Sequence, residues 1–120
     1  MSWNAYLDTP DGIHVGDWNY THNTNGMIAA ALKAAGHGDT EQCGGPLGPA
    51  IGPAWWKRLS GMSGRDSVAF LDAIITELTD HPDVYAPMNG WGTRESLIGV
   101  LTEMRDAVPP VTETVWTTSG

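Results

Sequence analysis

The fold is decided by the stretch Gly16-Asp-Trp-Asn-Tyr-Thr-His-Asn-Thr-Asn-Gly26, which precedes an apolar segment of helical character. It holds more hydrogen-bonding groups than a core accommodates and more large rings than an ordinary loop needs. Where a strand leads into a helix N-terminus, unpaired backbone N–H groups and a partial positive charge face whatever lies in front. The stretch therefore predicts a strand-to-helix connection with a candidate polar binding site.

The residues before this stretch indicate a β-hairpin. Apolar and aromatic residues occupy positions 3–7 and recur through 12–20, and Asp8-Thr-Pro-Asp-Gly12 separates the two runs. Proline presets the backbone at an early turn position, and Gly12 can adopt the left-handed conformation that closes a turn. We expect two antiparallel strands joined by this turn.

Helical periodicity follows the stretch in three long segments. The first begins at Thr24 or Asn25, the second has the capping spacing of Ser63 and Asp66 and ends at His81-Pro82, and the third ends at Pro109-Pro110. Their expected buried faces are Ile28, Ala31, Leu32 and Ala35; Val68, Leu71, Ile75 and Leu78; and Leu97, Val100, Leu101, Met104 and Val108. Gly99 weakens the third helix by about 1 kcal/mol relative to alanine, which suggests close packing at that point.

Two further segments complete the expected fold. Pro53–Leu59 is typical of a short helix, and the β-branched, alternating residues 111–118 predict a C-terminal strand. Residues 36–54, rich in glycine and proline, predict an ordered surface loop. We therefore expect one domain over residues 1–120, of the α+β class. Its small antiparallel sheet combines the N-terminal hairpin with the C-terminal strand and packs against about three α-helices.

Composition limits the classes of partner. Six basic and 14 acidic residues give a formal net charge of −8, which repels phosphate backbones and anionic lipids, so neither nucleic acid nor a membrane is expected as a partner. The longest apolar run, Met27 to Leu32, is far shorter than the roughly 20 residues of a membrane helix. No secretory signal pattern is visible at the N-terminus, so the expected compartment is the cytoplasm.

The order of these features resembles a family of small, mostly uncharacterised proteins of bacteria and their phages, especially those of actinobacterial hosts. The resemblance is carried by an Asn-x-Thr-x-Asn segment, a break after the middle helix, an Asn-Gly-Trp-Gly segment before the last helix, and the final strand. These correspond to Asn19, Thr21 and Asn23, to His81-Pro82-Asp83, to Asn89-Gly90-Trp91-Gly92, and to residues 111–118. The glycine- and proline-rich loop and the Trp55-Trp56 pair depart from that pattern. The resemblance implies an architecture, and for a phage protein the host cytoplasm, but no reaction.

The candidate site consists of two segments, each in front of a helix. The first contributes Asn19, Tyr20, Thr21, His22 and Asn23, and the second contributes Asn89, Trp91 and Thr93. For the first segment, ligand binding and simple capping are equally supported, although one cap needs fewer polar side chains than are present. For the second, a structural role of the indole is favoured over stacking on a ligand. If both helix N-termini open onto one crevice, Trp91 with Trp18 or Tyr20 would form its apolar walls.

Catalytic and metal chemistry are not favoured by the motifs present. His14, Asp17 and His22 could form a metal-binding set, but strand alternation places His14 and Asp17 on opposite faces, and no HExxH or CxxC spacing supports it. Neither a nucleophile elbow nor a phosphate loop is present. We therefore assign no catalytic residue, no metal ligand and no identified cofactor.

Two functions are favoured, and an enzyme is a third, less favoured alternative. The first is a non-catalytic accessory protein that binds a small polar molecule, nucleotide-like ligands included, at the two helix N-termini. The alternative is a phage- or bacteria-encoded modulator that binds a host protein. In that alternative Trp55 and Trp56, beside Lys57-Arg58, form a partner-binding hot spot, with one indole directed outward and the other into the core.

Overall fold

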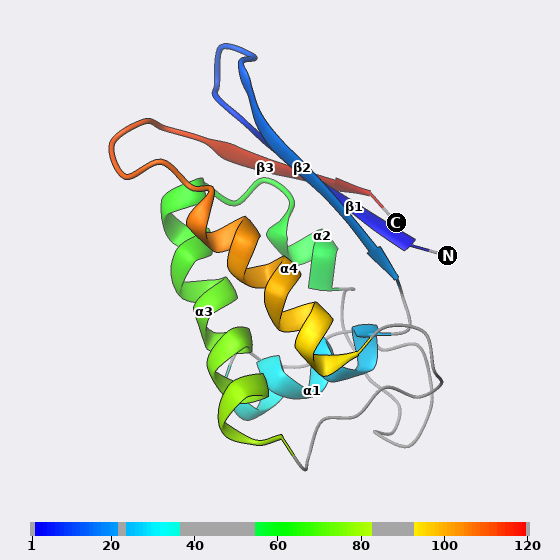
Figure 1. Ribbon diagram of the computed structural model, residues 1–120. Helices are drawn as coiled ribbons and strands as arrows, with labels where there is room; N and C mark the ends of the chain where they lie inside the picture. Colours follow the sequence, from blue (N-terminus) through cyan, green and yellow to red (C-terminus); the bar gives the residue numbers. More distant parts are fainter. Residues whose placement is uncertain (1, 22–23, 37–54, 83–92, 120) are drawn as a thin grey trace.

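The computed structural model describes residues 2–21, 24–36, 55–82 and 93–119. These residues form three strands and four helices, in an α+β arrangement that confirms the expected fold class. The elements are β1 (Ser2–Asp8), β2 (His14–Thr21), α1 (Asn25–Ala34), α2 (Trp55–Leu59), α3 (Gly64–Asp80), α4 (Arg94–Asp106) and β3 (Val115–Ser119). The four helices of the described residues all lie on one side of the sheet (Figure 1).

The sheet has the strand order β2-β1-β3, and both pairings are antiparallel. The C-terminal strand therefore closes against the N-terminal hairpin, as the sequence predicts. In the hairpin turn, Gly12 has a φ of 93° and donates its N–H to the carbonyl of Thr9 over 3.0 Å. Only glycine adopts this left-handed conformation readily, which confirms the expected turn chemistry.

The strand β3 is shorter than expected, because it begins at Val115 rather than at residue 111. The preceding residue, Thr114, does not pair with the sheet; its carbonyl accepts the N–H of Gly64, the first residue of α3, over 2.9 Å. The segment between α4 and β3 is thus tied to the start of α3.

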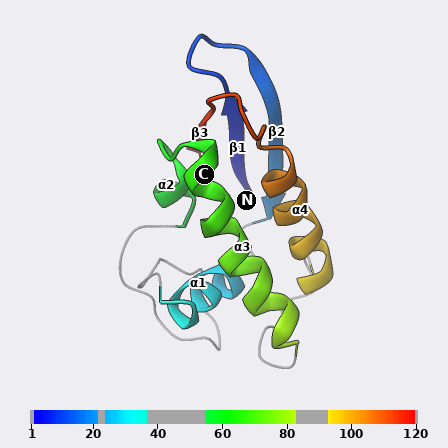
Figure 2. The ribbon, with the colours of Figure 1, turned by 90° about the vertical axis from the view of Figure 1, so that its left-hand side faces the viewer.

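The core lies between the inner face of the sheet and the helices. On β1 the side chains of Trp3, Ala5 and Leu7 are fully buried, and Trp116 of β3 joins them. Helix α3 is the central helix, because it contacts both α1 and α4 (Figure 2). This arrangement leaves the start of α4 and the end of β2 close together.

Two of the expected helix boundaries are confirmed. The hydroxyl of Ser63 accepts the N–H of Asp66 over 3.1 Å at the start of α3, and the helix ends at Asp80 with His81 at its C-cap. The side chain of Thr93 caps α4. Ser63 and Thr93 each cap a helix in the usual way, through a side-chain oxygen that accepts a backbone N–H of the first turn.

Two expectations for the helix faces are wrong. Val68 is 38% exposed, because the buried stripe of α3 passes through Ser67, Phe70 and Leu71 instead. Gly99 does not pack closely against another element, since a methyl group placed there would find no atom within 4 Å. None of the described helices combines the length and the apolar character needed to cross a bilayer.

Candidate functional site

The first candidate segment begins on the outer face of the sheet, where Asn19 is used within the hairpin. Its amide nitrogen lies 2.9 Å from the hydroxyl of Ser2, 2.9 Å from the side-chain oxygen of Asn4 and 3.1 Å from the carbonyl of Trp3. Asn4 is also its cross-strand neighbour. These contacts occupy the donors of the Asn19 amide, so this side chain stabilises the hairpin and has only its carbonyl oxygen to offer a ligand.

The connection from β2 to α1 is held by two side-chain bonds. The hydroxyl of Thr24 donates to the carbonyl of Thr21 over 3.0 Å, so Thr24 occupies the N-cap position without capping the helix with its side chain. Asn25 is buried, and its side-chain oxygen accepts the indole N–H of Trp55 over 3.0 Å. The start of α1 is therefore anchored in the core, and Asn25 is a structural residue.

The second candidate segment ends at Thr93, whose hydroxyl is engaged with Ser96. The Thr93 oxygen accepts the N–H of Ser96 over 3.0 Å and donates to the hydroxyl of Ser96, also over 3.0 Å. The hydroxyl proton of Ser96 then has no acceptor among the described residues. Ser96 was not predicted as a site residue, although the Thr-x-x-Ser spacing at a helix start is a capping signal that could have identified it.

Arg94 fixes the start of α4 against the end of α3. Its guanidinium donates to the carbonyl of Leu78 over 2.7 Å and pairs with Glu95 over 2.8 Å. Arg94 was also not predicted, because nothing in the sequence indicates which carbonyl lies within its reach. Its charge lies beside the first turn of α4, where the helix already presents partial positive charge.

The two segments meet at Tyr20 and Thr93. The backbone N–H of Thr93 donates to the hydroxyl of Tyr20 over 3.4 Å, across 73 residues of sequence. This is a long hydrogen bond, but it places the end of β2 directly beside the start of α4. We call this place the β2–α4 junction; it comprises Tyr20, Thr93 and Ser96.

The hydroxyl group of Tyr20 keeps a free donor at this junction. It accepts from Thr93, and its own proton has no acceptor among the residues that the structure describes. Tyr20 is half-buried, whereas Thr93 and Ser96 are exposed. A ligand oxygen at the junction could therefore accept from two hydroxyl groups and from the N–H groups of Arg94 and Glu95, since the N–H of Ser96 is already bonded to Thr93.

The remaining predicted site residues cannot be placed in the same way. His22, Asn23, Asn89 and Trp91 lie outside the described residues, and Thr21 is half-buried at the end of β2. Trp18, the alternative wall residue, packs against Trp116 with ring centroids 5.5 Å apart. Trp18 therefore extends the core beneath β2.

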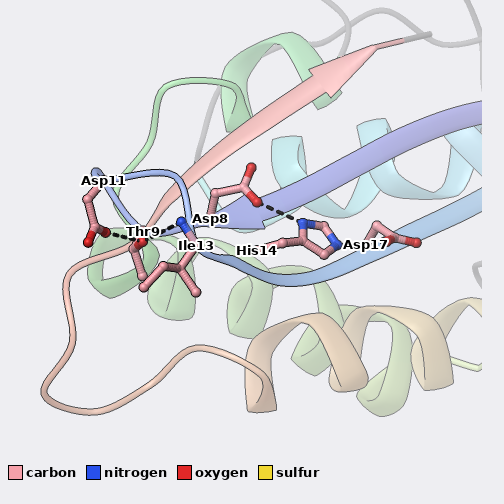
Figure 3. Close-up of polar contacts among 6 residues, drawn as sticks. All are labelled: Asp8, Thr9, Asp11, Ile13, His14 and Asp17. Atoms are coloured by element: carbon pink, nitrogen blue, oxygen red, sulfur yellow. Dashed lines mark hydrogen bonds and ion pairs between the residues drawn. The ribbon is translucent and has the colours of Figure 1, made fainter.

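A separate polar group lies on the outer face of the hairpin. His14 contacts Asp8 through Nδ1 at 2.7 Å and Asp17 through Nε2 at 2.8 Å, and Figure 3 shows its ring between the two carboxylates. These hydrogen bonds, first that to Asp8 and then that to Asp17, raise the pKa of His14 above its ordinary value. Only the doubly protonated ring can donate to both carboxylates at once, which is why these contacts favour the imidazolium form.

The expectation that His14 and Asp17 face opposite sides of the strand is wrong. A register shift between Leu7 and Asp8 pairs Leu7 with Gly16 but Asp8 with His14, so Val15 is an extra residue. A bulge of this kind inverts the alternation on one side of it and brings His14 and Asp17 to the same face. The described residues include no group of three His, Cys, Asp or Glu side chains arranged to hold a metal ion.

The expected orientation of the tryptophan pair is also wrong. Trp55 and Trp56 are both buried, 0% and 8% exposed, although one was expected to point outward. The physical reason is that α2 has neighbours on two sides, α1 and β3. Trp55 meets Trp3 edge to face at 4.8 Å, so it belongs to the core and not to a hot spot for a partner.

Comparisons of the chain with protein-family models, with curated proteins and with solved structures find no match. The site is therefore described from the sequence and the geometry of this chain.

Proposed function

We propose that this chain is a non-catalytic accessory protein that binds a small polar molecule at the β2–α4 junction. The observation that carries the proposal is the contact between Tyr20 and Thr93, because it brings together the two segments that the sequence selects independently. The site would comprise the described Tyr20 and Thr93 together with Asn89 and Trp91, whereas Thr21, which pairs with Ser2, lies on the opposite face of β2 from Tyr20. His22 and Asn23 would complete it from the end of β2.

The chemistry of the junction favours a ligand with acceptor oxygens. The hydroxyl protons of Tyr20 and Ser96 and the first two N–H groups of α4 are donors, whereas the charge of Arg94 is paired with Glu95 over 2.8 Å. Phosphate, carboxylate and carbonyl groups are the acceptors that such an array binds. With Trp91 as a stacking surface, a nucleotide-like molecule is the ligand class that this proposal names.

Thermal unfolding with nucleoside monophosphates tests this proposal. We expect millimolar AMP, GMP, CMP or UMP to raise the melting temperature, because a ligand that binds only the folded state stabilises it. Asn23→Ala and Trp91→Ala should abolish that rise and leave the melting temperature without ligand unchanged. A similar loss of stability in both variants without ligand would mean that these residues are framework, and no rise with any of the four nucleotides would exclude this ligand class.

The second candidate function is a phage- or bacteria-encoded protein that binds a partner protein. The observation that favours it is a pair of exposed apolar side chains on two neighbouring loops: Ile13 is 62% exposed and Val111 is 90% exposed. Apolar side chains that gather on a surface mark interaction sites. This candidate no longer depends on Trp55 and Trp56, which are buried.

A further inference from the structure

A cavity of about 780 Å³ lies at the far end of α4 from the junction. Its lining comes from Pro10 in the hairpin turn, from the start of α3, from the end of α4 and from the segment that connects α4 to β3. Figure 1 shows the hairpin turn and this loop extending beyond the helices on the same side of the molecule. Among the described residues, none of the predicted site residues lines this cavity.

The cavity is lined by both apolar and polar side chains. The lining includes Val68, Val108 and three prolines, at positions 10, 109 and 110. Val68 is the α3 residue that sequence periodicity places in the core and the structure exposes. Ile13 and Val111 lie on the same two loops and are exposed, although neither lines the cavity. Solvent-exposed apolar side chains on both sides of a groove are typical of a surface that binds another chain.

The charges around the cavity favour a basic partner. Of the five charged lining residues, Arg105 and Asp106 pair with each other over 3.1 Å. Asp66 and Glu113 are exposed and have no partner among the described residues, and neither has Arg65. The described lining therefore has two unpaired carboxylates and one unpaired cation, in a chain whose net charge is −8.

One buried polar group at this place also lacks a partner. Thr114 lines the cavity and is 5% exposed, and its hydroxyl makes no hydrogen bond to a described residue. The hydroxyl oxygen has less than 1 Å² of accessible surface and lies against Gly64, so a molecule in the cavity would not reach it. The exposed Arg65 is the accessible donor of the lining, and the backbone carbonyl oxygens of an extended peptide would suit it.

We propose that this cavity is a docking groove for a short peptide segment of a partner protein that carries apolar and basic side chains. The apolar side chains would contact Val68 and the proline-lined walls, and the basic side chains would pair with Asp66 and Glu113. The inference rests on the second candidate function and names its surface and partner chemistry. It is independent of ligand binding at the β2–α4 junction.

Two end-blocked heptapeptides test it in an NMR titration of the full chain. They share the same apolar residues, and three positions are lysine in one and glutamate in the other. We expect the lysine peptide to bind about tenfold more tightly at low salt, and to shift the amide signals of Val68, Glu113 and Thr114. Equal affinities, shifts confined to other residues, or no shift at millimolar peptide would overturn the assignment.

Charge reversal supplies the matched variants. Glu113→Lys should remove the preference for the lysine peptide, whereas Glu103→Lys, on the exposed surface of α4 and outside the lining, should keep it. Val68→Thr keeps the side-chain shape and should weaken both peptides, because only the apolar contact is lost. If the protein captures a partner whose binding the lysine peptide does not inhibit, the second candidate function stands. The docking groove proposed here would then be wrong, because that partner binds another surface.

Discussion

The hydroxyl of Tyr20 and the backbone N–H of Thr93 meet at 3.4 Å and connect two segments that are 73 residues apart in sequence. Each segment precedes a helix, and each is rich in amide, hydroxyl or indole groups. The connection is possible because β2 is an edge strand of the sheet and α4 contacts it. The sheet order therefore determines where the candidate site lies.

The first prediction concerns two helical glycines. Gly99→Ala should stabilise the protein by about 1 kcal/mol, because nothing occupies the space and alanine favours the helix. Gly64→Ala should destabilise it by about 1–3 kcal/mol, because the new methyl group would lie 2.0 Å from the Thr114 hydroxyl and 3.0 Å from Val108. Urea denaturation measures both. Equal effects of the two substitutions would contradict the packing described.

The second prediction concerns pH. The folded state raises the pKa of His14 above its ordinary value of 6.5, so folding is favoured by protonation of this ring. That contribution is complete below about pH 6.5 and is lost as the pH rises through the folded-state pKa. The effect should be small, because the ring is half-exposed. Urea midpoints between pH 5.5 and 9 should fall more for the wild type than for His14→Gln, and parallel curves would show that the two carboxylates do not stabilise the imidazolium.

The third prediction tests whether Trp55 belongs to the core or to a surface that binds a partner. Trp55→Ala should cost about 3–5 kcal/mol of folding free energy, because a fully buried indole that packs on Trp3 is lost. Lys57→Ala, at an exposed position of the same helix, should change stability by less than about 0.5 kcal/mol. Thermal or chemical denaturation decides. A stable Trp55→Ala variant would mean that this side chain is not part of the core.

The fourth prediction concerns the cap of α4. Thr93→Ala should cost about 1 kcal/mol, because the N–H of Ser96 loses its acceptor. Thr93→Ser keeps the hydroxyl group and should retain most of the stability. The two variants can be compared by urea denaturation, where equal losses would indicate that the Thr93 methyl group, and not the cap, matters.

Much of the fold could be predicted because local rules determine it. Gly12 in a short polar turn and Ser63 three residues before Asp66 are signals whose physical meaning depends on few other residues. The alternating final segment likewise predicts a strand, although its first four residues connect to α3 through Thr114 instead.

The rest depends on contacts between distant residues. Val15 is a bulge residue only because Asp8 pairs with His14, and no local pattern shows that pairing. Trp55 and Trp56 are both buried because α2 lies between α1 and β3, which periodicity on a five-residue helix cannot reveal. Helical spacing alone places Val68 in the apolar stripe of α3, but the assembled core buries Phe70 and Ile74 and leaves Val68 exposed. The cavity beside Val68 is formed by two loops, so only the assembled structure reveals it.

The most direct test of the β2–α4 junction is native mass spectrometry of the protein purified from its own source. The wild type should retain a small molecule, and Tyr6→Phe should retain it equally, because Tyr6 lies on the outer face of the same sheet and bonds to no described residue. Tyr20→Phe removes only the hydroxyl group and should lose the bound mass while remaining folded. A wild-type protein without any bound molecule, or a Tyr20→Phe variant that retains it as well as Tyr6→Phe does, would contradict the account.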